Sequence, residues 1–112
     1  MGDVRVVDRG QREIVVFLAG AVDGSMRAAL DQAVEEVDAL EHLNLLDRAI
    51  VDMHAVEAMD SAGIDFLHAL AERGRRHGFD LQMSALSGAA HRALEHGGWS
   101  FAEHSPPSPT DR

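Results

Sequence analysis

The chain has 112 residues, of which 46% are hydrophobic and 26% charged, and its formal net charge is -9. This length allows one compact domain and excludes two independent cores, and the composition is that of a globular protein. The negative charge makes nucleic acid a poor partner, because it would repel the phosphate backbone. The lack of cysteine excludes disulfides, thiolate zinc sites and cysteine nucleophiles.

Membrane insertion and metal binding are not predicted. No apolar run approaches the ~20 residues that cross a bilayer, and the first residues lack the pattern of a signal peptide. The seven histidines show no spacing typical of metal ligands, and the phosphate loop Gly-x-x-x-x-Gly-Lys is absent. We therefore expect a cytoplasmic protein with no membrane span, no metal and no cofactor.

The first half of the chain predicts a hairpin followed by a helix. Residues 4–7 and 14–18 are β-prone runs separated by a turn. A loop around Asp23 comes next, and Ser25 is a candidate cap for a helix that runs to Leu40. The apolar positions of this helix form one stripe, made of Met26, Leu30, Val34, Val37 and Leu40.

The stretch 49–63 organises the second half. Residues 49–53 form an apolar run that predicts a buried strand, and residues 54–59 are expected to form a six-residue loop. A helix over residues 61–77 should follow, with Asp60 and Ser61 as neighbouring candidates for its N-cap.

Glycines and apolar residues define the rest of the chain. Gly63 should allow close approach at the helix start, and Gly78 should end that helix. The predicted buried face of the helix consists of Ile64, Leu67, Leu70 and Ala71. Residues 81–85 alternate like a strand, and Ser87 is expected to cap a last helix that ends at His96.

The C-terminal end divides into two parts. Trp99 and Phe101 are predicted to anchor it against the core, so that the domain spans residues 1–104. Residues 105–112 contain three prolines and are expected to form a disordered tail.

Strands that alternate with helices predict an α/β domain with a mixed, mostly parallel sheet of about four strands and about three helices. Functional side chains of such sheets gather at the carboxyl ends of the parallel strands. We therefore expect Asp23, Asp52, His54 and Ser61 near one edge. Asp52 is expected to close a local hydrogen-bond network rather than to perform acid-base chemistry.

The run Ile-Val-Asp-Met at 50–53, the six residues after it, and Asp-Ser-Ala-Gly-Ile at 60–64 resemble the signature of the STAS domain, the family of anti-sigma factor antagonists. The likeness extends from about Ile14 to Trp99 and implies a single STAS-type domain. It also implies that Ser61 is phosphorylated by an anti-sigma factor that is a serine kinase. Ala62 stands where many members have a second hydroxyl residue, which leaves one acceptor.

The resemblance implies a bacterial regulator of sigma-factor-dependent transcription, not an enzyme. Unphosphorylated, it would bind the anti-sigma factor; phosphorylation would end binding, and a Ser/Thr phosphatase would reset it. The implied partner-binding residues are Asp23, Met59, Asp60, Ser61, Ala62 and Gly63. The sequence is equally compatible with purely structural roles for these residues. Asp23 and Asp60 could cap turns or a helix, and Met59 could pack at the edge of the core.

Three other functions compete with this interpretation. The chain is also compatible with a STAS subunit of a stress-signalling or lipid-transport complex in which Ser61 is never phosphorylated. A nucleotide-binding or nucleotide-hydrolysing enzyme lacks support, because no phosphate loop or nucleophile and base pair is present. A phosphoaspartate receiver centred on Asp52 would need a lysine, and the chain has none.

Overall fold

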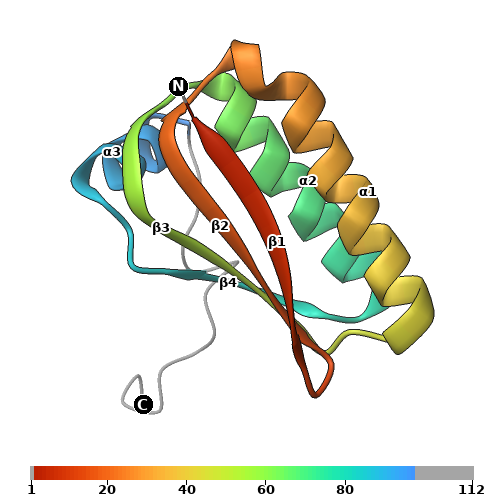
Figure 1. The fold of residues 1–112 in the computed structure, drawn as a ribbon. Helices are drawn as coiled ribbons and strands as arrows, with labels where there is room; N and C mark the ends of the chain where they lie inside the picture. The colour runs from red at the N-terminus through yellow and green to blue at the C-terminus, as the bar shows by residue number, and fades with distance from the viewer. Residues whose placement is uncertain (1, 98–112) are drawn as a thin grey trace, which may run out of the picture.

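The computed structural model describes residues 2–97, in which a four-stranded sheet forms one layer and the two long helices form the other (Figure 1). In spatial order the strands are β1 (Asp3–Gly10), β2 (Glu13–Val22), β3 (Arg48–Met59) and β4 (Asp80–Ser84). β1 pairs antiparallel with β2, whereas β2 with β3 and β3 with β4 are parallel. The predicted mixed, mostly parallel sheet is thus confirmed.

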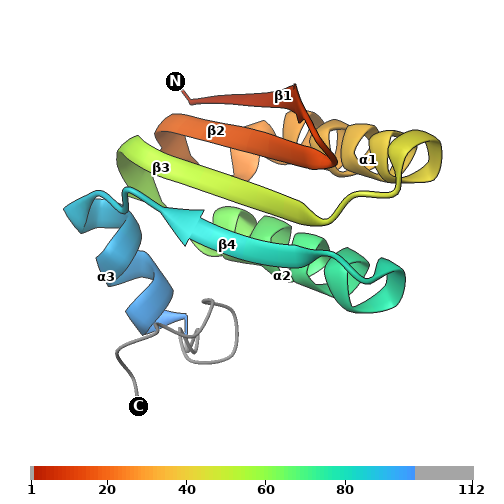
Figure 2. The ribbon, with the colours of Figure 1, turned by 90° about the horizontal axis from the view of Figure 1, so that it is seen from below.

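The helices are η1 (Gly24–Met26, a 3-10 turn), α1 (Arg27–Asn44), α2 (Ser61–His77) and α3 (Gly88–His96). α1 and α2 lie side by side on one face of the sheet, and α3 lies beyond the end of β4 (Figure 2). Each of the two long helices follows one of two neighbouring parallel strands, so both begin at the same edge of the sheet (Figure 1). Within residues 2–97, the prediction of about three helices is also confirmed.

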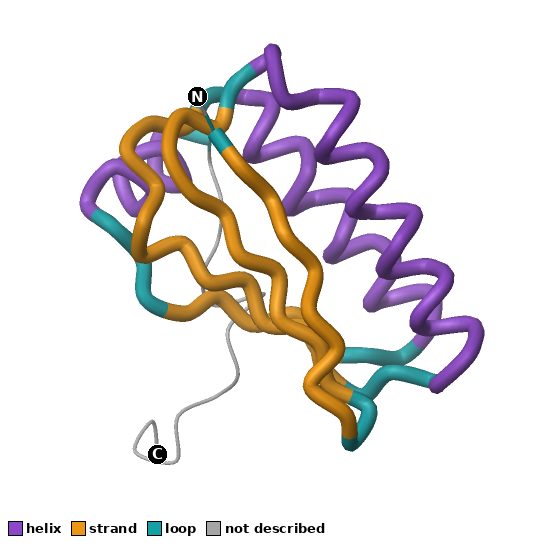
Figure 3. The backbone as a smooth tube through the Cα atoms, in the orientation of Figure 1, coloured by secondary structure: helices purple, strands orange, loops and turns teal. Residues whose placement is uncertain are grey.

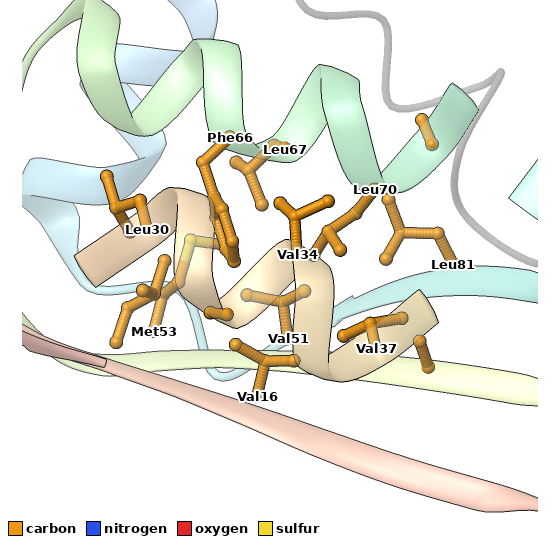
Figure 4. Packing of buried hydrophobic residues seen from close by; sticks show 14 of the residues in the cluster. Val16, Leu30, Val34, Val37, Val51, Met53, Phe66, Leu67, Leu70 and Leu81 are labelled. Atoms are coloured by element: carbon orange, nitrogen blue, oxygen red, sulfur yellow. The ribbon is translucent and has the colours of Figure 1, made fainter. Parts of the chain in front are cut away.

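The hydrophobic core lies between the sheet and the two long helices (Figure 4). Alternate residues of β2 and β3 face it, because successive side chains of a strand point to opposite faces. The fully buried strand residues in this core include Ile14, Val16, Leu18, Val22, Ala49, Val51 and Met53. The predicted helix stripes are buried as well, although Leu40 is only half-buried, and Phe66, which the sequence pattern did not single out, is 3% exposed.

The predicted loop over residues 54–59 is wrong, because β3 continues to Met59. β2 pairs with it throughout, with irregularities between Phe17 and Ala19 and between Gly20 and Ala21. These irregularities interrupt the regular alternation of side chains that marks a strand in a sequence. The pairing with β2 therefore extends β3 over residues whose own sequence pattern does not predict a strand.

The start of the first helix also differs from the prediction. Ser25 does not cap it; instead the Asp23 carboxylate accepts hydrogen bonds from the Ser25 backbone N–H at 3.0 Å and from the Ser25 hydroxyl at 2.5 Å. This ordering of the loop produces η1, after which α1 runs to Asn44, four residues past the expected end.

The predicted bounds of the second long helix are confirmed. α2 spans Ser61–His77 and ends at Gly78, whose φ of 86° is in the left-handed region that favours glycine. Ser87 caps α3 by accepting a hydrogen bond from the Ala90 N–H at 3.0 Å. Trp99, Phe101 and the tail over 105–112 lie outside the described residues.

Gly74 provides a test of the packing between α2 and β4. A Cβ at Gly74 would lie 2.7 Å from the backbone oxygen of Phe79, which cannot move without shifting the chain. Gly74→Ala should therefore lower stability by about 1 to 3 kcal/mol despite the higher helix propensity of alanine. Chemical denaturation measures the change. Gly24→Ala is the control, because no atom lies within 4 Å of the added Cβ, and an equal stability of both variants would contradict this packing.

Candidate functional site

The ends of β2 and β3 bring the two candidate aspartates to the same edge of the sheet. Val22 pairs with Met59 at the last position of both strands, and the Asp60 N–H donates to the Val22 carbonyl at 3.1 Å. Asp23 and Asp60 each follow directly, in the short connections to η1 and α2 (Figure 3). The structure therefore places these two predicted residues next to each other, with Ser61 at the start of the adjoining helix.

Asp60 is the N-cap of α2. Its carboxylate accepts a hydrogen bond from the Ala62 N–H at 2.8 Å, and its carbonyl accepts from the N–H groups of Gly63 and Ile64 at 3.1 and 3.3 Å. Of the two predicted cap candidates, Asp60 thus fulfils this role. The carboxylate also complements the partial positive charge of a helix N-terminus.

Ser61 is the first residue of α2 and is exposed. Its hydroxyl has no hydrogen-bond partner among residues 2–97. Because Asp60 caps the helix, the hydroxyl of Ser61 is not required to hold the helix start. A chemical group added to this oxygen would extend from a fixed backbone into solvent.

The next two residues of the motif are buried. Ala62 is 2% exposed, and a Cβ at Gly63 would lie 2.6 Å from Cγ of Met59. Met59 is the last residue of β3, not part of a loop, and packs half-buried against the core. Gly63 is therefore needed so that the first turn of α2 can approach the end of β3.

Asp23 is held by Ser25 rather than by Ser61. The hydrogen bond from the Ser25 hydroxyl lowers the pKa of the Asp23 carboxyl below its ordinary value. Asp23 is thus a carboxylate at neutral pH, and with Asp60 it contributes negative charge to this edge of the sheet.

Asp52 and His54 do not belong to this group, so the prediction that they share its edge is wrong. β3 continues seven residues past Asp52, which is about 20 Å of strand. The Asp52 carboxylate accepts from the His54 N–H at 3.0 Å and lies 2.6 Å from His54 Nδ1. Burial raises the pKa of Asp52, but these two hydrogen bonds outweigh it and lower the pKa overall. The predicted local hydrogen-bond network of Asp52 is confirmed.

Within 2–97, no group of three or more histidine, aspartate or glutamate side chains is placed to hold a metal ion. No helix in this range is both long and apolar enough to cross a bilayer.

Comparison with known proteins identifies the family. Residues 6–100 match the family model described as "Mlab, STAS domain". The chain belongs to the STAS domain family. The match covers part of β1, the whole of β2, β3 and β4, and the motif at the site of this STAS domain. No curated protein sequence matches the chain.

Solved structures share the fold. The anti-sigma factor antagonist SpoIIAA, in its unphosphorylated form, has a TM-score of 0.75 at 12% identity, with 97% of this chain and 90% of that chain covered. An anti-sigma factor antagonist from Mycobacterium paratuberculosis has a TM-score of 0.70 at 27% identity, covering 99% and 88%. SLC26A9 has a TM-score of 0.58 at 15% identity, covering 98% of this chain but 23% of that one. The STAS fold thus occurs both as nearly a whole chain and as a small part of a longer one.

His54→Ala tests the origin of the low pKa of Asp52. Removing the imidazole leaves burial in place but deletes one hydrogen bond, so the pKa of Asp52 should rise. NMR titration of the Asp52 carboxyl carbon measures it, with His42→Ala, in the last turn of α1, as the control.

The same variant has an expected effect on acid stability. A carboxyl whose folded-state pKa is lowered stabilises the fold above its ordinary value of 3.8, and this contribution is lost as the pH falls through the folded-state pKa. His54→Ala should therefore reduce stability at neutral pH and make it less dependent on pH in the acid range. An unchanged Asp52 pKa would show that His54 does not set it.

Proposed function

We propose that this STAS domain is an anti-sigma factor antagonist that binds an anti-sigma factor while unphosphorylated and is switched off by phosphorylation of Ser61. The general role is supported by the family and by the likeness to the antagonist from Mycobacterium paratuberculosis. In this proposal the anti-sigma factor is also the serine kinase, and a Ser/Thr phosphatase restores the active form. The protein acts in the cytoplasm of a bacterium and regulates transcription through a sigma factor.

The observation that carries the proposal is the free hydroxyl of Ser61 at the exposed start of α2. The kinase would transfer the γ-phosphoryl group of ATP to Ser61 Oγ, forming the O–P bond, releasing ADP and taking up the hydroxyl proton. Because Asp60 holds the helix cap independently of this hydroxyl, the modification leaves the fold intact. It changes the charge of the surface instead.

The charge at the site explains why phosphorylation would end binding. A phosphoserine adds about 1.5 to 2 negative charges next to the Asp60 carboxylate and near Asp23. A partner that covers this surface must remove water from all of these groups, and the cost of doing so rises with each unpaired charge.

Within this proposal Ser61 is an acceptor and not a catalytic nucleophile. A nucleophilic serine requires a base within hydrogen-bond reach of its hydroxyl. None of the described residues forms a hydrogen bond with the side-chain hydroxyl of Ser61. The Asp60 carboxylate, which is its neighbour in sequence, is occupied by the Ala62 N–H. These facts support a binding role without an enzymatic activity of the domain itself.

A second candidate is a STAS subunit of a larger stress-signalling or lipid-transport complex that functions without phosphorylation. The coverage of only 23% of SLC26A9 favours it, because the fold is there a part of a much longer chain. In this case the same edge of the sheet would be a constitutive contact surface.

The two candidates differ in the behaviour of Ser61 variants. Incubation with the cognate kinase and ATP should place one phosphate on Ser61, and Ser61→Ala should abolish labelling but still bind the anti-sigma factor. Ser61→Asp should weaken binding less than phosphorylation does, because aspartate adds one charge where phosphoserine adds about 1.5 to 2. Intact mass, phosphosite mapping and binding titrations measure these effects.

Ser87→Ala is the matched control, since Ser87 caps α3 as part of the fold and should not change labelling at Ser61. Labelling at Ser25, Ser84 or Ser87 together with equal binding by all Ser61 forms would remove Ser61 from the mechanism and favour the second candidate.

A further inference from the structure

A small groove lies between α1 and α2 and reaches the first turn of α2. It has a volume of about 60 Å³, and its apolar lining includes Leu30 and Val34 of α1 and Ala62 and Phe66 of α2. Figure 4 shows Leu30, Val34 and Phe66 in the layer where these two helices meet the sheet. Ala62 directly follows Ser61 in the chain, so the groove lies close to the proposed phosphoacceptor.

An ion pair joins the two helices at this groove. Arg27, the first residue of α1, places Nη1 3.4 Å from Oδ2 of Asp65 on α2, and the two side chains are 54% and 61% exposed. Exposed pairs of this kind contribute little to stability, so the guanidinium changes partner at small cost. Among the described residues that line the groove, Arg27 is the only basic one.

Asp65 and Ser61 occupy the same face of α2. They are four residues apart, so their Cβ atoms lie about 6 Å from each other. An arginine that reaches Asp65 from α1 is therefore within one helical turn of a phosphate carried by Ser61. The long arginine side chain can cover this difference by rotation about its own bonds.

The backbone of α2 offers that phosphate few donors. The N–H groups of Ala62, Gly63 and Ile64 are already bonded to Asp60. The neighbouring charged side chains, Asp60 and Asp65, are carboxylates and repel it. A nearby side-chain cation would offset the new charge, and a guanidinium binds the oxygens of a phosphate in a strong bidentate geometry.

We propose that Arg27 is the counter-ion of phosphorylated Ser61, and that phosphorylation draws its guanidinium away from Asp65. This inference rests on the proposed function. The phosphate, with about twice the charge of a carboxylate, outcompetes Asp65 for the arginine. The movement takes the guanidinium towards the start of α2, where Ala62 lines the groove.

The exchange couples charge to the shape of the surface. In the unphosphorylated form Arg27 is held at Asp65. In the phosphorylated form the arginine and the phosphate would lie together at the start of α2. A partner that covers the start of α2 would then meet a different arrangement of charged side chains as well as added charge.

The test measures the pKa of the phosphate itself and needs neither kinase nor anti-sigma factor. Phosphoserine is installed at position 61 during synthesis of the full chain, and ³¹P NMR follows its second ionisation in the parent and in Arg27→Gln. Loss of a nearby cation disfavours the dianion, so Arg27→Gln should raise this pKa by about 0.5 unit. In the parent, the Arg27 side-chain N–H resonance should shift over the same pH range.

Arg73→Gln is the matched control. Arg73 also joins α2 to α1, through Asp38 at 3.1 Å, but it lies twelve residues beyond Ser61 in α2, about 18 Å along the helix. Arg73→Gln should leave the phosphate pKa unchanged.

Equal shifts in the two variants, or no shift in Arg27→Gln, would overturn the role of Arg27. Either result leaves the phosphorylation of Ser61 by a kinase untouched, because the phosphate is installed synthetically. Conversely, a chain that no kinase labels would refute the proposed function. The titration would still decide whether Arg27 pairs with a phosphate installed at Ser61.

Discussion

The parallel pairing of β2 with β3 is the interaction on which the candidate site depends. It keeps the two strands in register from Glu13 and Arg48 to Val22 and Met59, and the hydrogen bond from Asp60 to Val22 continues it past the strand ends. Because both strands end at the same level, the helices that follow them start at the same level. Asp23, Asp60 and Ser61 come together for this reason, although Asp23 and Asp60 are 37 positions apart in the chain.

At the start of α2, the residues that hold the structure differ from the residue that carries the exposed hydroxyl. Asp60 caps the helix, and Gly63 lets it approach Met59 at the end of β3. Ser61 has neither task, so its hydroxyl is exposed on a backbone that is fixed from both sides. A site of this kind can be modified without a loss of fold, which is a requirement for a reversible switch.

Two arginine ion pairs between α1 and α2 differ in length and exposure. Arg73 places one nitrogen 3.1 and 3.2 Å from the two carboxylate oxygens of Asp38, and these side chains are 28% and 38% exposed. The pair of Arg27 and Asp65 is longer and more exposed. The helices are thus held firmly away from the site and more weakly beside it, where a change of partner would have consequences for binding.

The sequence by itself determined the order of the elements, the α/β class, the core stripes of α1 and α2, and the limits of α2. These features are local: apolar spacing, the cap at Asp60 and the left-handed Gly78 act within a few residues. The serine motif also identified the candidate acceptor, because its residues are adjacent in the chain.

Only the tertiary structure decided that β3 continues to Met59. β2 supplies the hydrogen bonds for that extension, and the irregular pairing of the two strands hides the alternation of side chains. The same extension separates Asp52 and His54 from Ser61. The approach of Arg27 to Asp65 could not be predicted from the sequence either, because it arises from the packing of α1 against α2. The contact between these helices depends on the register of the strands beneath them.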